Sequence, residues 1–136
     1  MLTSAEEKLW RLVDLLQTTT NFFEEKGITN ARLNAELLLC SILEMERVDL
    51  YVNFERPITQ DELVKFREVV QKRSLHEPLQ YILGKTEFMS LPFRVNHSVL
   101  IPRQDTEALV EWVIEDYEGA DAASILDLGT GSGNIA

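Results

Sequence analysis

The last residues of the chain carry the pattern with the most obvious chemical use. A glycine-rich loop, Gly129-Thr130-Gly131-Ser132-Gly133, follows the run Ile125-Leu126-Asp127-Leu128, in which a single acid stands among apolar residues. A loop after a parallel strand needs glycine where the backbone turns sharply and where a ligand approaches it closely. The carboxylate of Asp127 suits a ligand that carries an ammonium group and repels a pyrophosphate. The pattern therefore predicts one side of a cofactor site.

The loop alone leaves three interpretations open. A dinucleotide site needs Gly-x-Gly-x-x-Gly, but Asn134 occupies the third glycine position and Gly133 comes one residue early. An acid followed by Gly-x-Gly-x-Gly is the usual pattern of an S-adenosylmethionine site. The third interpretation is a glycine-rich connection that binds nothing. By itself the loop indicates a superfamily and no substrate.

The two halves of the chain differ in the elements that their sequences predict. Residues 1–75 predict helices. Ser4 and Glu7 form a possible capping box, and Gly27 can end the helix that they begin. A second helix is expected over about 29–44. The apolar positions predicted to face the core of these two helices are Leu9, Trp10, Val13, Leu16, Leu33, Leu37, Leu38 and Ile42. Phe22 and Phe23 are also expected in the core.

Two further elements complete the helical part. A short third element is expected around 49–53, before Pro57. Thr59 and Glu62 form a second capping box for a helix that reaches about Arg73, with Leu63, Phe66, Val69 and Val70 as its apolar stripe. The short connections indicate a compact antiparallel bundle.

After residue 74 the pattern changes to short mixed elements. Residues 77–84 predict a turn of helix or an irregular link. Two strands, 85–89 and 93–96, predict a hairpin around Ser90-Leu91-Pro92, and 99–102 is a third extended piece. Asp105 or Thr106 can cap a helix that ends at Gly119, and a strand is expected over 124–128. The apolar positions of the expected helix are Leu109, Val110, Val113, Ile114 and Tyr117, and Trp112 is also expected in the core.

The expected fold is therefore mainly α. It consists of a small N-terminal helical bundle (1–75), a linker with a β-hairpin (76–104), and the truncated start of a Rossmann-like domain (105–136), of which 124–128 is the first strand. A single parallel strand cannot cover its two faces or pair its own backbone.

Composition excludes several classes of protein. The 136 residues are 45% hydrophobic, which is too high for a disordered chain. The net charge is −10, and the part from Ser74 onward holds 3 basic and 10 acidic residues, so no basic stripe is available for nucleic acid. No apolar run is long enough for a membrane span, and the acidic N-terminus is unlike a signal peptide. The single cysteine, Cys40, fits a reducing cytoplasm as a small buried side chain.

The segments upstream of the loop narrow its meaning. They are 77–84 (Glu-Pro-Leu-Gln-Tyr-Ile-Leu-Gly), Glu87-Phe88, 99–107 (Val-Leu-Ile-Pro-Arg-Gln-Asp-Thr-Glu) and 125–133. As a set they closely resemble the HemK-type protein-glutamine methyltransferases. The resemblance covers the whole chain in layout and is most specific between 77 and 133. It implies an S-adenosylmethionine-dependent enzyme that methylates the side-chain amide of the glutamine in the Gly-Gly-Gln motif of peptide chain release factors. The implied activity is thus linked to translation termination through its protein substrate.

The resemblance also assigns residues. Asp127, Gly129, Thr130, Gly131, Ser132 and Gly133 match the family's cofactor-binding loop. Arg103, Asp105, Thr106 and Glu107 match the motif that closes the site from the linker side. Gln104 stands where the family usually has proline, which loosens the local backbone. The family's Asn-Pro-Pro-Tyr motif, which grips the target amide, is absent from these 136 residues, so no catalytic residue is assigned and the chain alone is expected to be inactive.

The resemblance implies a release factor as the partner, with no direct nucleic acid and no membrane, in a cytoplasmic and monomeric protein. The alternative is a non-catalytic module that binds release factors through its helical part. His76 and His97 are too few and too far apart to indicate a metal site, and we expect none. The acidic positions Glu111, Glu115, Asp116 and Glu118 read as a solvated helix face, or else as a surface for a basic partner.

Overall fold

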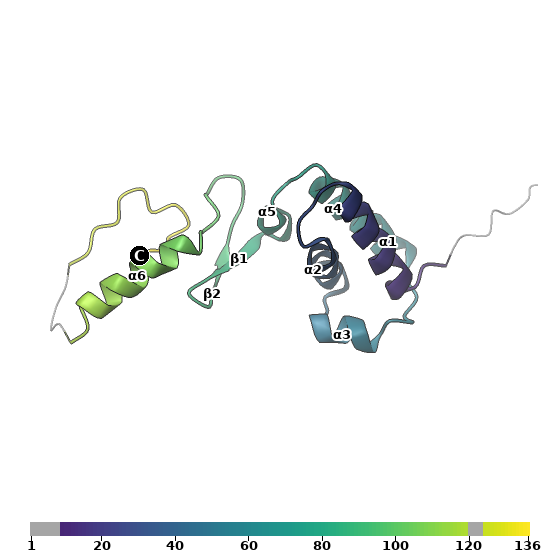
Figure 1. Ribbon diagram of the computed structural model, residues 1–136, viewed down its shortest axis with the longest axis horizontal. Coiled ribbons are helices and arrows are strands. Elements are labelled where there is room, and N and C mark those ends of the chain that lie inside the picture. Colours follow the sequence, from purple (N-terminus) through teal and green to yellow (C-terminus); the bar gives the residue numbers. More distant parts are fainter. Residues whose placement is uncertain (1–8, 120–123) are drawn as a thin grey trace, which may run out of the picture. The chain divides into compact units, whose positions relative to one another are not determined.

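The protein is described here by a computed structural model that covers residues 9–119 and 124–136 (Figure 1). The chain forms two compact units that divide between Ile82 and Leu83. The predicted capping box of Ser4 and Glu7 lies outside the described residues.

The first unit is a bundle of helices. Its elements are α1 (Leu12–Glu25), α2 (Ala31–Leu43), α3 (Arg47–Val52) and α4 (Gln60–Ser74), followed by α5 (Leu79–Leu83) at the boundary of the units. Helix α2 packs against α1, α3 and α4 and is therefore the central element (Figure 1). The buried core comes mainly from the first four helices and includes Leu12, Leu16, Phe23, Leu38, Leu39, Leu50 and Phe66.

Helix α1 begins later than its apolar pattern predicts. Trp10 and Arg11 are extended, and Arg11 forms an isolated antiparallel bridge with Pro57. The Ile58 amide donates to the Trp10 carbonyl at 2.8 Å, and the Leu12 amide donates to the Arg56 carbonyl at 2.9 Å. This pairing with a distant segment replaces a first helical turn. Consequently Leu9 is exposed, and its predicted place in the core is wrong.

The predicted C-terminal end of α1 and the predicted start of α4 are confirmed. Gly27 has φ +70°, and the Ile28 and Gly27 amides donate to the Phe23 and Glu24 carbonyls, which is the Schellman arrangement. At α4 the Thr59 hydroxyl accepts from the Glu62 amide, and the Glu62 carboxylate accepts from the Thr59 amide. The capping box therefore forms as its sequence indicates.

The second unit contains the hairpin and one helix. Strands β1 (Lys85–Phe88) and β2 (Leu91–Arg94) pair antiparallel with Phe88 opposite Leu91, and α6 spans Asp105–Asp116. The turn is thus Met89-Ser90, not the predicted Ser90-Leu91-Pro92. Both residues have positive φ, 51° and 60°, as the two central residues of a type I′ hairpin turn do.

Two predictions for this unit are wrong. Residues 124–128 form no strand, and among the described residues β1 and β2 pair only with each other. Residues 99–102, predicted as an extended piece, lie outside the helices and strands. Helix α6 has no buried residue, and Trp112, expected in the core, is 65% exposed. A strand needs a partner for its backbone and an apolar stripe needs a surface to cover it, and the described part of this unit offers neither.

Candidate functional site

The glycine-rich loop adopts a backbone that only glycine enters easily. Gly129, Gly131 and Gly133 have φ of +75°, +58° and +77°, and the Gly133 amide closes a turn on the Thr130 carbonyl at 2.9 Å. A side chain at these positions would be strained in this conformation. The spacing of the glycines therefore follows from the shape of the loop.

The loop shares a pocket with the segment that precedes α6. Its volume is about 160 Å³. Arg103 and Thr106 line it together with Gly129, Thr130, Gly131 and Ser132, and the other lining residues are Leu100, Ile101, Pro102, Asn134 and Ile135. Two segments more than twenty residues apart, which the family resemblance assigns to one site, thus line the same pocket.

Asp127 stands out because one of its oxygens is unsatisfied. The residue is half-buried, yet its Oδ2 atom is buried and has no hydrogen-bond partner within the described part of the chain. A buried carboxylate oxygen without a donor is costly. An incoming cation with N–H groups would satisfy it.

The remaining predicted site residues, Asp127 among them, do not line this pocket. Gly133 contributes the turn amide described above, and Asp105 is exposed in the first turn of α6. Glu107 points elsewhere, since its Oε1 atom accepts a hydrogen bond from the Met89 amide at 2.7 Å. The pocket thus includes Arg103 and Thr106 but neither carboxylate of the motif.

Asn134 is a pocket residue that the sequence analysis did not assign to the site. Its Oδ1 atom accepts from the Ser132 hydroxyl at 2.9 Å, which ties two lining residues together. The sequence did hold a signal, because Asn134 occupies the position of the third glycine in a dinucleotide-binding loop. That position was interpreted as evidence against a dinucleotide site and not as a place for a side chain that lines a pocket.

A second pocket in the same unit is strongly acidic. It has a volume of about 340 Å³ and is lined by Glu87, Met89, Ser90, Gln104, Glu107 and Glu111. Among the residues that the structure describes, no group of three His, Cys, Asp or Glu side chains is arranged to hold a metal ion.

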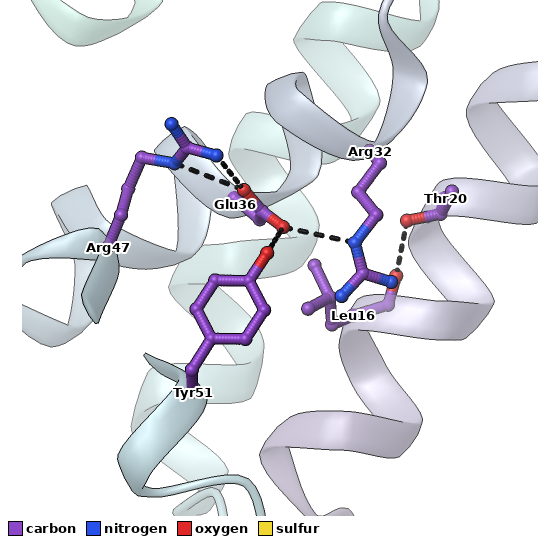
Figure 2. Close-up of polar contacts among 6 residues, drawn as sticks. All are labelled: Leu16, Thr20, Arg32, Glu36, Arg47 and Tyr51. Atoms are coloured by element: carbon purple, nitrogen blue, oxygen red, sulfur yellow. Dashed lines mark hydrogen bonds and ion pairs between the residues drawn. The ribbon is translucent and has the colours of Figure 1, made fainter. Parts of the chain in front are cut away.

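The helical unit contains a buried charge cluster that no sequence pattern predicted. Figure 2 shows Glu36 of α2 between Arg32, Arg47 and Tyr51. Glu36 is 1% exposed, and its carboxylate accepts from Arg47 at 2.7 Å, from Tyr51 at 2.6 Å and from Arg32 at 3.0 Å. Burial raises the pKa of Glu36, but the hydrogen bonds from Tyr51 and the two arginines lower it by more, so its pKa lies below the ordinary value.

This cluster joins elements of the bundle and lies in the unit that does not contain the glycine loop. Arg47 and Tyr51 come from α3, and Arg32 and Glu36 come from α2. Every contact that the carboxylate makes ties α3 to α2 or braces α2 itself. The available signal was a single acid within the run Ala35-Glu36-Leu37-Leu38-Leu39.

An apolar groove lies on the same unit. It has a volume of about 190 Å³ and runs between α1 and α4. The residues that line it are Trp10, Leu15, Thr18, Thr19, Phe22, Leu63, Phe66, Arg67 and Val70. Phe22, expected in the core, is therefore only half-buried, whereas Phe23 is fully buried.

Across the described part of the chain, every helix is too short or too polar to cross a membrane.

Curated relatives match nearly the whole chain. Release factor glutamine methyltransferase of Geobacter sulfurreducens is 47% identical over 129 residues, which is 95% of this chain and 45% of the relative. The proteins of the same name from Chlorobaculum tepidum and Rhodopirellula baltica are 47% and 37% identical, covering 96% and 100% of this chain and 46% and 47% of their own lengths. The chain thus spans about half the length of these relatives.

A family model matches residues 14–84, which is just over half of the chain, and its description is PrmC N-terminal domain. The match covers all of α2 to α5 and nearly all of α1. Through this helical unit, the chain belongs to the PrmC N-terminal domain family.

Proposed function

We propose that the chain is the N-terminal part of an enzyme that transfers a methyl group from S-adenosylmethionine to a release factor. The acceptor is the side-chain amide nitrogen of the glutamine in the Gly-Gly-Gln motif. The observation that carries the proposal is the pocket in which Arg103 and Thr106 meet the loop Gly129–Ser132. The names of the relatives support the reaction and the acceptor protein.

The residues present fit one end of this cofactor. Asp127 offers a buried, unpartnered oxygen to the ammonium group of the methionine moiety. Thr130, Ser132 and Arg103 bring hydroxyl groups and a guanidinium to the pocket, which can meet the carboxylate of the same moiety. A volume of about 160 Å³ is below the ~300–1,000 Å³ typical of sites for whole drug-sized ligands, and it suits the methionine end without the nucleoside.

The reaction divides the work between this chain and the rest of the enzyme. The bound cofactor would supply a methyl group on a positively charged sulfonium. A glutamine amide is a poor nucleophile because its nitrogen lone pair is delocalised, so its orientation toward that methyl group is essential. The residues of this chain would hold the cofactor, and an Asn-Pro-Pro-Tyr motif outside it would hold the amide. For that reason we expect no turnover by these 136 residues alone.

The proposed organisation assigns a role to each part. Residues 1–75 recognise the release factor, 76–104 form the linker, and 105–136 begin a Rossmann-like methyltransferase domain in a cytoplasmic monomer. A second candidate, a non-catalytic module that binds release factors, is favoured by one observation. The groove between α1 and α4 is almost wholly apolar and open, which suits an apolar side chain of a partner.

Cofactor binding tests the site directly. In the full-length protein, that is, this segment with the remainder of the enzyme, calorimetry should detect S-adenosylmethionine binding. Asp127→Asn should weaken it about tenfold or more, because a charge-assisted contact to the ammonium is lost. Asp116→Asn, which removes an exposed carboxylate at the end of α6, should leave it unchanged.

A dinucleotide provides the opposing outcome. NAD should not bind, because Asp127 repels a pyrophosphate. Binding of NAD without S-adenosylmethionine, or equal affinities for the Asp127→Asn and Asp116→Asn proteins, would show that the site has been misassigned.

A further inference from the structure

Glu107 has a different position from the one that its motif suggests. It does not line the glycine-loop pocket, and its carboxylate instead reaches the turn of the hairpin. We infer that Glu107 is a positioning residue that ties the Met89-Ser90 turn to the first turn of α6 and so sets where Arg103 and Thr106 stand. The inference rests on the proposed function only in naming the ligand that Arg103 and Thr106 serve.

The turn supplies a donor that needs a partner. In a two-residue turn between Phe88 and Leu91, the Met89 amide lies outside the ladder of strand hydrogen bonds. Met89 as a residue is half-buried. The Glu107 Oε1 atom accepts from it at 2.7 Å, a short bond to an ionised acceptor, and such bonds are about twice as strong as neutral ones.

The hairpin is a firm point of attachment. Phe88 is 1% exposed and meets Phe93 edge to face, with ring centroids 6.1 Å apart. Val95 is buried, and its amide donates to the Gly84 carbonyl at 3.1 Å, which closes the open end of the hairpin. The position of Met89 is therefore set by the packing of the preceding residue, Phe88, and by the register that pairs Phe88 with Leu91.

The first turn of α6 transmits the constraint to the pocket. The Glu107 amide donates to the Gln104 carbonyl at 2.9 Å, and the Thr106 amide donates to the Arg103 carbonyl at 3.0 Å. Arg103 is four residues before Glu107, about 6 Å along a helical path, and Thr106 directly precedes Glu107. Because Arg103, Thr106 and Glu107 belong to one hydrogen-bonded turn, a tie through the Glu107 side chain limits the movement of the other two residues.

The first readout needs no cofactor. In the 136-residue chain, Glu107→Ala should speed hydrogen exchange of the Met89 amide about tenfold and shift its proton resonance, because the acceptor is gone. Glu107→Gln keeps an acceptor oxygen and should change exchange by less than about threefold. Glu111→Ala, which removes another carboxylate of the same acidic pocket one turn later on α6, should leave the Met89 amide unchanged.

The second readout is the kinetics of the full-length enzyme. Glu107→Ala should raise KM for S-adenosylmethionine about tenfold with kcat within about twofold, Glu107→Gln should recover most of the loss, and Glu111→Ala should have no effect. Unchanged Met89 exchange in Glu107→Ala would overturn the inference, as would equal KM values for Glu107→Ala and the unaltered enzyme. Absence of turnover in the unaltered enzyme would instead contradict the proposed function, and the exchange readout would still decide the role of Glu107.

Discussion

At the scale of single residues, the buried carboxylate of Glu36 and the half-buried carboxylate of Asp127 are in opposite situations. Glu36 is enclosed by Arg32, Arg47 and Tyr51, and both of its oxygens accept hydrogen bonds. Asp127 has a buried oxygen with no donor. A satisfied buried charge indicates a structural role, whereas an unsatisfied buried oxygen next to a glycine-rich loop in the sequence is a candidate ligand contact.

Replacing Glu36 should destabilise the helical unit. Glu36→Gln should lower the free energy of unfolding by roughly 2 kcal/mol. That is less than the about 3–5 kcal/mol for a fully buried pair, because the side chains of Arg32 and Arg47 are 45% and 52% exposed and can be solvated. Urea unfolding followed by circular dichroism measures the loss, and Glu68→Gln on an exposed position of α4 serves as a control, expected within about 0.5 kcal/mol of the unaltered chain.

The loss should depend on pH. Because the folded-state pKa of Glu36 is depressed below its ordinary value of 4.5, its contribution is present above that value and disappears as the pH falls through the folded-state pKa. The difference between the unaltered chain and Glu36→Gln should therefore be full at pH 7 and shrink below about pH 4.5. A difference that is constant from pH 7 down to acid unfolding would show that the charge of Glu36 contributes nothing.

At the scale of elements, local signals predicted what local interactions determine. The capping box of Thr59 and Glu62 and the glycine at the end of α1 form as the sequence indicates, because their hydrogen bonds join residues three to five positions apart. The predicted start of α1 was wrong, because Trp10 and Arg11 pair with residues 57 and 58. A local sequence pattern cannot indicate a contact between segments so far apart in the chain.

The spacing of apolar residues predicted where the helices lie better than it predicted which face of each helix is buried. Leu38 is buried as expected, but Leu33 in the same stripe is 38% exposed, because burial depends on which neighbouring helix covers each face. Likewise the residues of the candidate site were assigned from motifs, and the motifs did not indicate the orientation of Glu107. A motif gives residue types and spacing, whereas the partner of Glu107, the Met89 amide, depends on where the hairpin turns.

The cap of α4 offers a test at this scale. Thr59→Ala should lower the free energy of unfolding of the helical unit by about 1 kcal/mol, because the Glu62 amide loses its acceptor. Thr59→Ser keeps the hydroxyl and should match the unaltered chain. Both variants retain the nearby ion pair of Arg56 and Glu62, at 2.7 Å, so the comparison isolates the cap. Equal stabilities for the alanine and serine variants in urea unfolding would mean that the hydroxyl of the cap contributes nothing.

At the scale of the whole molecule, the two units differ in how completely they bury their apolar residues. The helical unit has a continuous core that includes Leu12, Phe23, Leu38 and Phe66. The second unit buries Phe88 and Val95 but exposes Trp112, Leu126 and Leu128, the last two by 81% and 82%. In the proposed enzyme, these side chains would face the remaining strands and helices of the methyltransferase domain.

This difference explains why the second unit was harder to predict from the sequence. The residues 124–128 have the composition of a buried parallel strand, and such a strand forms only where neighbouring strands pair with it and helices cover it. The glycine loop depends less on those neighbours, since its turn closes between Thr130 and Gly133. The turn of the loop therefore forms in this chain, whereas the strand expected before it does not.

The most direct test is methyl transfer by the full-length protein to a purified release factor. With S-adenosylmethionine present, mass spectrometry of release-factor peptides should find one added methyl group on the glutamine of the Gly-Gly-Gln motif, and none when that glutamine is replaced. Binding of the release factor without any transfer, in a preparation where a known methyltransferase is active, would contradict the enzymatic function and favour the binding module.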